Sequence, residues 1–171
     1  RHGVNAVLHH EISDVDIAEG FTQQVDAGAW VISNSWGPST GNPVYEEATF
    51  QLPANPPAVI KTAYDYAETT GRGGKGTVIL FAAGNSNDVL DYNGTYTTNL
   101  AVAAVGDVGL KAYYSSFGPK MGIAAPSNGA IRGITTTAAN GQHTDSFGGT
   151  SSACPFAAGV VGLIFSANPA L

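Results

Sequence analysis

Short apolar runs alternate with amphipathic stretches along this chain. One amphipathic stretch repeats an apolar residue every four positions, at Ile17, Phe21 and Val25. It begins behind a capping-box-like Ser-x-x-Asp pattern at 13–16 and ends before Gly28, so the pattern predicts a helix. Apolar runs over 5–8 and 30–33 flank this helix and are typical of buried strands. The order strand, helix, strand predicts a right-handed crossover and a parallel sheet.

The same alternation continues to the end of the chain. The predicted elements are a helix over 57–70, strands over 77–82 and 100–105, short segments over 113–117, 122–125 and 131–135, and a helix over 152–167. The two strands are apolar on both faces, as the central strands of a parallel sheet are. The last helix is apolar almost all round, which predicts burial through the middle of the domain. Five prolines over 37–57 indicate a surface excursion.

Composition narrows the class of protein. The chain carries 7 Lys and Arg against 13 Asp and Glu, a net charge of −6, and its few basic residues are scattered. Without a basic stripe, nucleic acid is excluded as a partner. The apolar runs are shorter than the ~20 residues that span a bilayer, so no membrane segment is expected. The low charge and many small polar residues lean towards secretion, and the one cysteine does not indicate a compartment.

Two polar residues follow predicted buried elements at positions where chemistry can occur. Ser151 lies at the mouth of the last helix, where backbone N–H groups and the helix dipole favour developing negative charge. Asn85 follows the strand over 77–82. From the residues alone, a serine at a helix start is more often a cap, and an asparagine after a strand is more often a turn residue. Both interpretations stay open at this point.

Five motifs resemble one family, in that family's order. The segment Gly149-Thr150-Ser151-x-Ala153-x-Pro155-x-x-Ala158-Gly159 resembles the nucleophile signature of the subtilisin-like serine proteases, the subtilases. Residues 33–37 and 81–85 are similar to its pocket and oxyanion segments, and 114–118 and 124–126 are weaker matches. Residues 35–38, 74–76, 148–150 and 167–169 further resemble the kexin branch, and the family resemblance implies a secreted or periplasmic location. The resemblance implies an α/β, three-layer fold with a mainly parallel central sheet, of which residues 1–171 would be a partial peptidase domain.

The resemblance also implies roles for individual residues. Ser151 would be the nucleophile of a serine endopeptidase, and Asn85 would donate its side-chain amide to the oxyanion together with the Ser151 backbone N–H. The substrate-pocket walls would be formed by Ser35, Trp36, Gly37, Ala83 and Gly84. The edge of the first wall would pair with a peptide or protein substrate as an added strand.

The family's catalytic Asp and His motifs find no match in these residues. His2-Gly3 begins like the histidine motif but does not continue it, and His143 has no matching context. We therefore expect the C-terminal part of a catalytic domain, inactive alone and with the remainder of its own domain as partner. The missing segment should leave apolar surface exposed on the sheet, which favours dimerisation.

Calcium binding and substrate preference depend on carboxylates near the pocket. Kexin-like enzymes place acidic residues after Trp-Gly-Pro to receive basic side chains and calcium, but residues 39–42 here carry none. Asp88 and Asp91 are left to supply a pocket floor or a Ca²⁺ site. Two carboxylates are too few for a shell of 6–8 oxygens unless carbonyls and waters join them, so no metal ligand is assigned and Ca²⁺ stays open.

Two other classes of protein fit parts of the pattern. A catalytically dead subtilase-like module could bind peptides by strand addition, although that role gives no reason to keep both Ser151 and Asn85. An unrelated flavodoxin-like binding domain would need a glycine-rich strand-to-helix turn. The glycine-rich segment 71–76 precedes a strand instead, which is the reverse of the phosphate-binding order.

Overall fold

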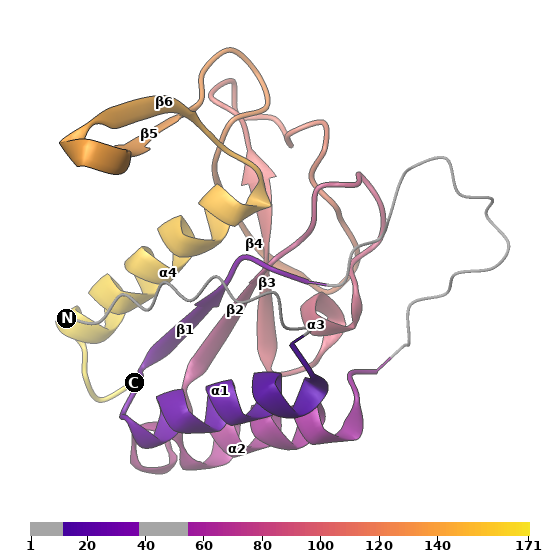
Figure 1. The fold of residues 1–171 in the computed structure, drawn as a ribbon, viewed down its shortest axis with the longest axis vertical. Coiled ribbons are helices and arrows are strands. Elements are labelled where there is room, and N and C mark those ends of the chain that lie inside the picture. The colour runs from indigo at the N-terminus through magenta and orange to yellow at the C-terminus, as the bar shows by residue number, and fades with distance from the viewer. Residues whose placement is uncertain (1–11, 38–54) are drawn as a thin grey trace, which may run out of the picture.

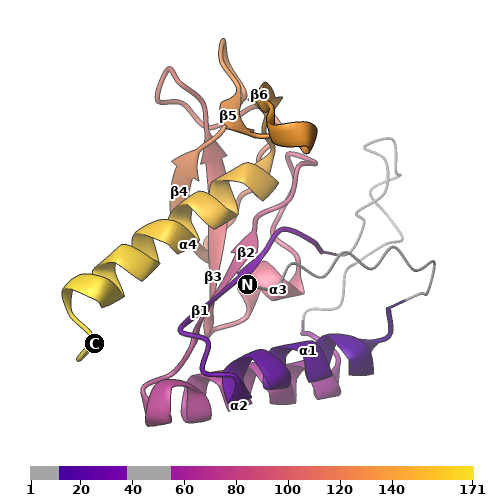
Figure 2. The same ribbon diagram turned by 60° about the vertical axis from the view of Figure 1, so that its left-hand side comes forward.

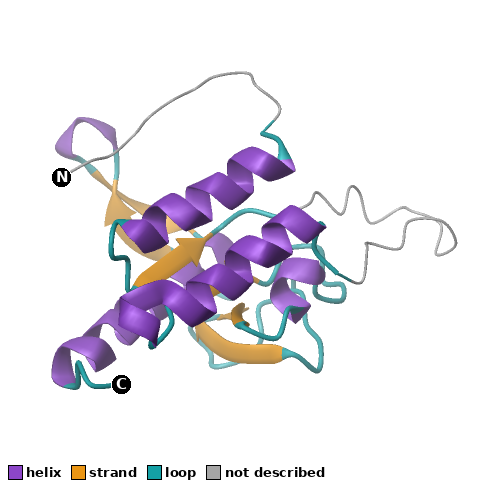
Figure 3. Ribbon diagram, turned by 90° about the horizontal axis from the view of Figure 1, so that it is seen from below, coloured by secondary structure: helices purple, strands orange, loops and turns teal. Residues whose placement is uncertain are grey.

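The computed structural model describes residues 12–37 and 55–171, which form three layers around a parallel sheet. Helices α1 (Asp14–Asp26) and α2 (Ala58–Gly74) lie on one face of the sheet, and α4 (Thr150–Ala167) lies on the other. Figures 1 and 2 show this layering, and Figure 3 shows α1 and α2 side by side from below. The α/β, three-layer prediction is confirmed.

The four strands follow chain order across the sheet. They are β1 (Val31–Asn34), β2 (Val78–Ala82), β3 (Asn99–Val105) and β4 (Met121–Pro126). Every neighbouring pair is parallel, with Ser33 opposite Leu80 and Leu80 opposite Leu100. The carboxyl ends of all four strands therefore meet at one edge, which is where open α/β sheets hold their sites. The strand expected over 5–8 lies outside the described residues.

Helix α1 begins where its capping pattern predicts. The Ser13 backbone N–H donates to Asp16 Oδ2 at 2.9 Å, and the Asp16 N–H donates to Ser13 Oγ at 3.2 Å. These reciprocal bonds satisfy two of the orphan donors at the helix start. The buried face of the helix includes Phe21 and Val25, two of the three predicted positions, and the chain leaves the helix at Gly28 with a φ of 83°.

An aromatic cluster joins α1 and α2 to the sheet. The Phe21 and Tyr64 ring centroids lie 5.0 Å apart, edge to face, and the Tyr64 and Phe81 centroids lie 5.9 Å apart. Ile60 and Ala67 extend the same buried face of α2, as their spacing predicts. Such ring pairs add stabilisation beyond the apolar area they bury. They fix the helical layer beneath β2, which leads into the candidate site.

The segments after β3 are less regular than the strands before them. Residues 113–117 form turns and no named strand, and α3 (Tyr92–Thr95) is a single turn. Strand β5 (Ile134–Thr137) pairs antiparallel with β6 (His143–Phe147), around a short 3₁₀ turn over Ala139–Gly141. Figure 1 shows this hairpin projecting from the body of the fold. The sequence did not predict β6 because its polar residues lack an alternating pattern, and most of them are exposed.

Helix α4 corrects one prediction about burial. One face packs against all four strands, but Phe156, Val160, Leu163 and Ile164 are 41–71% exposed. The expectation that an all-apolar helix is buried on every side is therefore wrong for this helix. Exposed apolar surface was expected on the sheet; among the described residues it occurs at Ile123 of β4 and, over a larger area, on α4. By its 18-residue length and mean hydropathy of 1.5 alone, α4 would pass as a membrane span, but its packing on the sheet assigns it to the fold.

Candidate active site

Three strand ends converge on the first turn of α4. The chain after β1 reaches Ser35, the chain after β2 reaches Asn85, and the chain after β4 reaches Asn128, and each forms a hydrogen bond with residues 149–151. Parallel strands bring their carboxyl ends to one edge, so residues far apart in sequence meet there. The site is thus built from segments that lie far apart in the sequence.

Ser151 lies in the first turn of α4 and is partly buried. Its Oγ donates to the Ser35 carbonyl oxygen over a long 3.5 Å, and Ser35 Oγ donates to the Ser151 carbonyl oxygen at 3.0 Å. The Ser151 hydroxyl makes no side-chain cap bond for the helix, whose N-cap is Gly149. The capping interpretation of Ser151 is therefore not supported by the structure, and the hydroxyl stays close to the end of β1.

Thr150 links the segment after β2 to the start of α4. Asn85 Oδ1 accepts from the Thr150 backbone N–H at 2.8 Å and from Thr150 Oγ1 at 2.9 Å. Thr150 Oγ1 in turn accepts from the Gly84 backbone N–H at 3.1 Å. Because two donors hold the Asn85 carbonyl oxygen, its amide nitrogen is left to donate elsewhere. No signal in the sequence indicated this role of Thr150 beyond its place in the Gly149-Thr150-Ser151 motif.

The segment after β4 holds the turn that precedes the helix. Ser127 Oγ donates to the Gly149 carbonyl oxygen at 2.7 Å, and the Gly149 N–H donates to Asn128 Oδ1 at 2.8 Å. Gly149 has a φ of 76°, a left-handed conformation that favours glycine. Tyr114 from the weaker motif donates to the Asn128 carbonyl oxygen at 2.9 Å. The weaker motif over 114–118 and the residues just after the motif over 124–126 therefore anchor the Gly149 turn.

Two of the predicted pocket walls, Trp36 and Gly37, contact an aromatic ring and a carboxylate. Trp36 is 45% exposed and packs edge to face on Phe81, with ring centroids 5.3 Å apart. A Cβ placed on Gly37 would lie 2.8 Å from Asp91 Oδ2, so this carboxylate contacts the Gly37 backbone. Burial raises the pKa of the Asp91 carboxyl, although the Gly94 N–H donates to it at 2.9 Å. Ala83 is buried beside this region.

Cys154 lies one turn into the same helix and faces the sheet. Its Sγ donates to the Asn34 carbonyl oxygen at 3.4 Å and lies 3.5 Å from Ser33 Oγ. Burial raises the pKa of the Cys154 thiol, and the thiol is the weaker nucleophile compared with the thiolate. The buried cysteine is thus a packing residue, and Ser151 is the nucleophile candidate in this helix.

Some candidate residues lie outside this arrangement. His143 begins β6, at the end of that strand remote from α4, and is exposed. Asp88 lies on the segment after Asn85, where its Oδ1 accepts from the Val89 N–H at 2.6 Å. Among residues 12–37 and 55–171, no three His, Cys, Asp or Glu side chains gather to hold a metal ion. Any Ca²⁺ shell of 6–8 oxygens formed by the described residues would therefore have to be completed by carbonyls, amides and waters.

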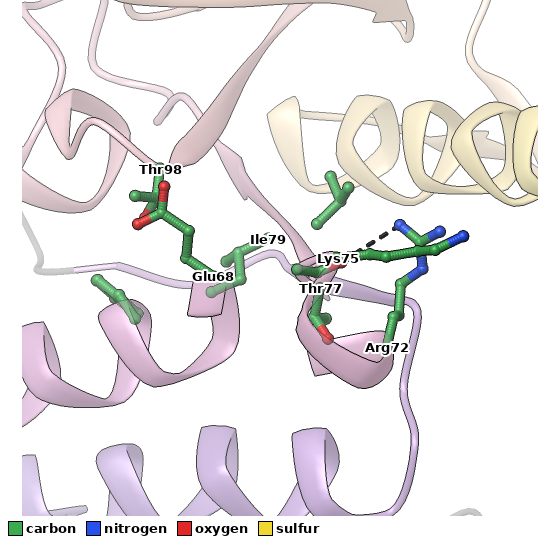
Figure 4. A pocket seen from close by; sticks show the side chains of 9 residues that line it. Glu68, Arg72, Lys75, Thr77, Ile79 and Thr98 are labelled. Atoms are coloured by element: carbon green, nitrogen blue, oxygen red, sulfur yellow. Dashed lines mark hydrogen bonds between the residues drawn. The ribbon is translucent and has the colours of Figure 1, made fainter. Parts of the chain in front are cut away.

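A separate cavity of about 200 Å³ lies at the opposite, amino end of β2. Figure 4 shows Glu68 and Thr98 at one side of it and Lys75 and Arg72 at the other. Both cations are engaged by the end of the chain, since Arg72 donates to the Leu171 carbonyl oxygen and Lys75 donates to that of Ala170 at 2.8 Å. A flavodoxin-like domain would hold its ligand at the carboxyl ends of the strands, so this cavity does not support that alternative.

The α/β fold around a four-stranded parallel sheet is the fold of the subtilisin-like serine hydrolases. The model of the Subtilase family matches residues 2–171, so the chain belongs to this family of serine endopeptidases. A calcium-dependent protease from a Nostoc species is 41% identical over 91% of this chain and 27% of its own length. The kexin of Candida albicans is 32% identical over 96% of this chain and 17% of its own length.

Solved structures agree with the sequence relatives. The prenylagaramide maturation protease PagA matches with a TM-score of 0.73 and 25% identity, over 95% of this chain and 53% of that chain. The chain therefore spans about half of that protein and about a quarter or less of the relatives above. Some more distant relatives are named extracellular proteases.

Proposed function

We propose that this chain is the part of a subtilase peptidase domain that carries the nucleophile, the oxyanion donor and the pocket walls. In this proposal Ser151 Oγ attacks the scissile carbonyl and forms an acyl-enzyme. Asn85 Nδ2 and the Ser151 backbone N–H donate to the tetrahedral oxyanion. The observation that carries the proposal is the pair of bonds from Thr150 to Asn85 Oδ1, which leaves the amide nitrogen as the free end beside the helix start.

The substrate pocket of this proposal is formed by Ser35, Trp36, Gly37, Ala83 and Gly84. Ser35 is bonded to the start of α4 through Ser151, and the Asp91 carboxylate lies against Gly37. A half-buried carboxylate against a pocket wall favours a cationic side chain, because the charge pair then replaces lost hydration. We infer a substrate peptide with Lys or Arg on the acyl side of the cleaved bond.

Proton transfer requires a group outside the described residues. Ser151 Oγ has only the Ser35 carbonyl oxygen as partner there, which cannot accept the proton as a base. We infer that the remainder of the peptidase domain supplies the base and covers the apolar face of α4. Residues 1–171 are then a partial domain, inactive alone and prone to pair through α4, and the whole protein acts outside the cytoplasm.

Covalent labelling with a fluorophosphonate tests the proposal. A protein that contains this chain and the rest of its domain should be labelled at Ser151, and the 171-residue chain should not. Ser151→Ala should abolish labelling, whereas Ser166→Ala, at an exposed position of the same helix, should leave it intact. Labelling that persists in Ser151→Ala would refute the assignment. Peptide binding without any labelling of the longer protein would favour the catalytically dead module.

A further inference from the structure

Lys111 lies at the end of a tight turn that follows β3. The Gly106 N–H donates to the Leu110 carbonyl oxygen at 3.0 Å, and Val105 bridges Lys111 in antiparallel fashion. Gly109 adopts a φ of 79°, which the reversal requires. The turn therefore directs the Lys111 side chain back toward the segment after β2. The backbone conformation of the turn sets the position of this side chain.

The Lys111 ammonium is held by three neutral oxygens. Its Nζ donates to Asn87 Oδ1 at 2.8 Å, to the Ser115 carbonyl oxygen at 2.8 Å and to the Ala112 carbonyl oxygen at 3.3 Å. It also lies 5.6 Å from the centroid of the Phe117 ring. An ammonium has three donors, and all three are used here. Within the described residues the Lys111 ammonium forms no ion pair with a carboxylate. Its charge therefore strengthens the hydrogen bonds to these three oxygens.

Asn87 belongs to the loop that carries Asn85. This loop and the segment over 114–117 are joined by backbone bonds from Asn87 to Tyr114 at 2.7 Å and from Ser116 to Gly84 at 2.9 Å. Asn87 has a φ of 51°, a left-handed conformation in which asparagine is favoured among non-glycine residues. Asn85 thus lies between Gly84 and Asn87, which are both bonded to the segment over 114–117. Asn87 is also bonded to the Lys111 ammonium.

We propose that Lys111 is a positioning residue for the oxyanion hole, a built-in cation that fixes the loop on which Asn85 lies. The proposal rests on the oxyanion role proposed for Asn85. Thr150 sets the direction of the Asn85 side chain, whereas Lys111 sets the place of its backbone through Asn87. Charge-assisted hydrogen bonds are stronger than neutral ones, so a single ammonium can hold three oxygens of two segments.

Amide hydrogen exchange on this chain tests the tether without any catalysis. Lys111→Met keeps an unbranched side chain one atom shorter and removes the charge, so exchange at the Asn87 and Ser116 amides should become at least about tenfold faster. Exchange in β2 and β3 should not change. Lys120→Met is the matched control, because Lys120 is exposed and forms no hydrogen bond among the described residues. Equal exchange in both variants would overturn the proposal.

Kinetics of the longer, active protein test the consequence for the oxyanion. Lys111→Met should lower kcat about tenfold with KM within about twofold, because a displaced donor weakens only transition-state binding. Lys120→Met should match the parent protein. An unchanged kcat, or a rise in KM alone, would overturn the positioning role. If the parent protein has no activity, the proposed function fails, and the exchange experiment still decides whether Lys111 tethers the loop.

Discussion

Replacing Thr150 by valine removes one hydroxyl and keeps the shape of the side chain. The hydroxyl is buried and connects two segments, since it donates to Asn85 Oδ1 at 2.9 Å and accepts from the Gly84 N–H at 3.1 Å. After the change, Asn85 Oδ1 keeps the Thr150 backbone N–H, but the Gly84 N–H loses its partner. The variant therefore removes both bonds of the Thr150 hydroxyl and keeps the bond from the Thr150 backbone N–H to Asn85.

The cost follows from what is left unpaired. A neutral hydrogen bond contributes about 0.5–1.5 kcal/mol net, and an unpaired buried donor costs about 1–3 kcal/mol. Gly84 is only partly buried, so we expect Thr150→Val to lower the free energy of unfolding by about 2 kcal/mol. For a chain of this length that corresponds to a melting temperature roughly 4–8 °C lower.

Urea unfolding, followed by circular dichroism, measures the change. Thr150→Ser keeps the hydroxyl and should be close to the parent protein. Thr70→Val, at an exposed position of α2, should change stability by less than about 0.5 kcal/mol. If Thr150→Val unfolds at the same urea concentration as Thr70→Val, the hydroxyl does not link the two segments, and the explanation for the direction of the Asn85 amide is wrong.

Three further changes test other parts of the structure. Tyr64→Phe removes the buried bond from the Tyr64 hydroxyl to Asn93 Oδ1 at 2.7 Å and should cost about 1–2 kcal/mol in urea unfolding; a neutral result contradicts the pairing. Burial raises the pKa of Asp91, so the ionised carboxylate opposes folding. The parent protein should therefore gain stability relative to Asp91→Asn as pH falls through that raised pKa towards 3.8, the ordinary pKa of the carboxyl. A gain in relative stability with rising pH would contradict this. Leu163→Glu should convert self-associated chains to monomers in light scattering, whereas Leu110→Glu, at a similarly exposed position, should not; equal effects contradict pairing through α4.

Local patterns in the sequence were sufficient to predict much of the fold. The capping box of α1 involves residues three apart, and the apolar face of α2 repeats within one helix, so both can be read from a short window. The parallel strands follow from their continuous apolar runs. The all-apolar pattern of α4 predicted too much burial, because periodicity does not say whether a second segment covers the face away from the sheet.

Contacts between distant residues could not be predicted in the same way. Thr150 and Asn85 are 65 residues apart, and Lys111 and Asn87 are 24 apart. Each of these residues has an ordinary turn or helix-start interpretation when it is taken alone. The family resemblance was sufficient to predict which motifs meet at the start of α4, but it did not predict which side chain holds which. The contact between Asp91 and Gly37 was likewise visible only after folding.

The two halves of the proposed site differ in where their positioning comes from. Ser151, Asn85 and the Gly149 turn are held by bonds to β1, β2 and β4 ends within the described residues. The base that must accept the Ser151 proton has no such support in this segment. The oxyanion side should therefore keep its geometry when the rest of the domain is absent, while the reactivity of Ser151 should depend on it entirely. We therefore expect the rest of the domain to change the rate at which Ser151 is labelled, because that rate depends on the base. The rate of amide exchange at Asn87 should stay the same, because the bonds that hold its loop lie within the described residues.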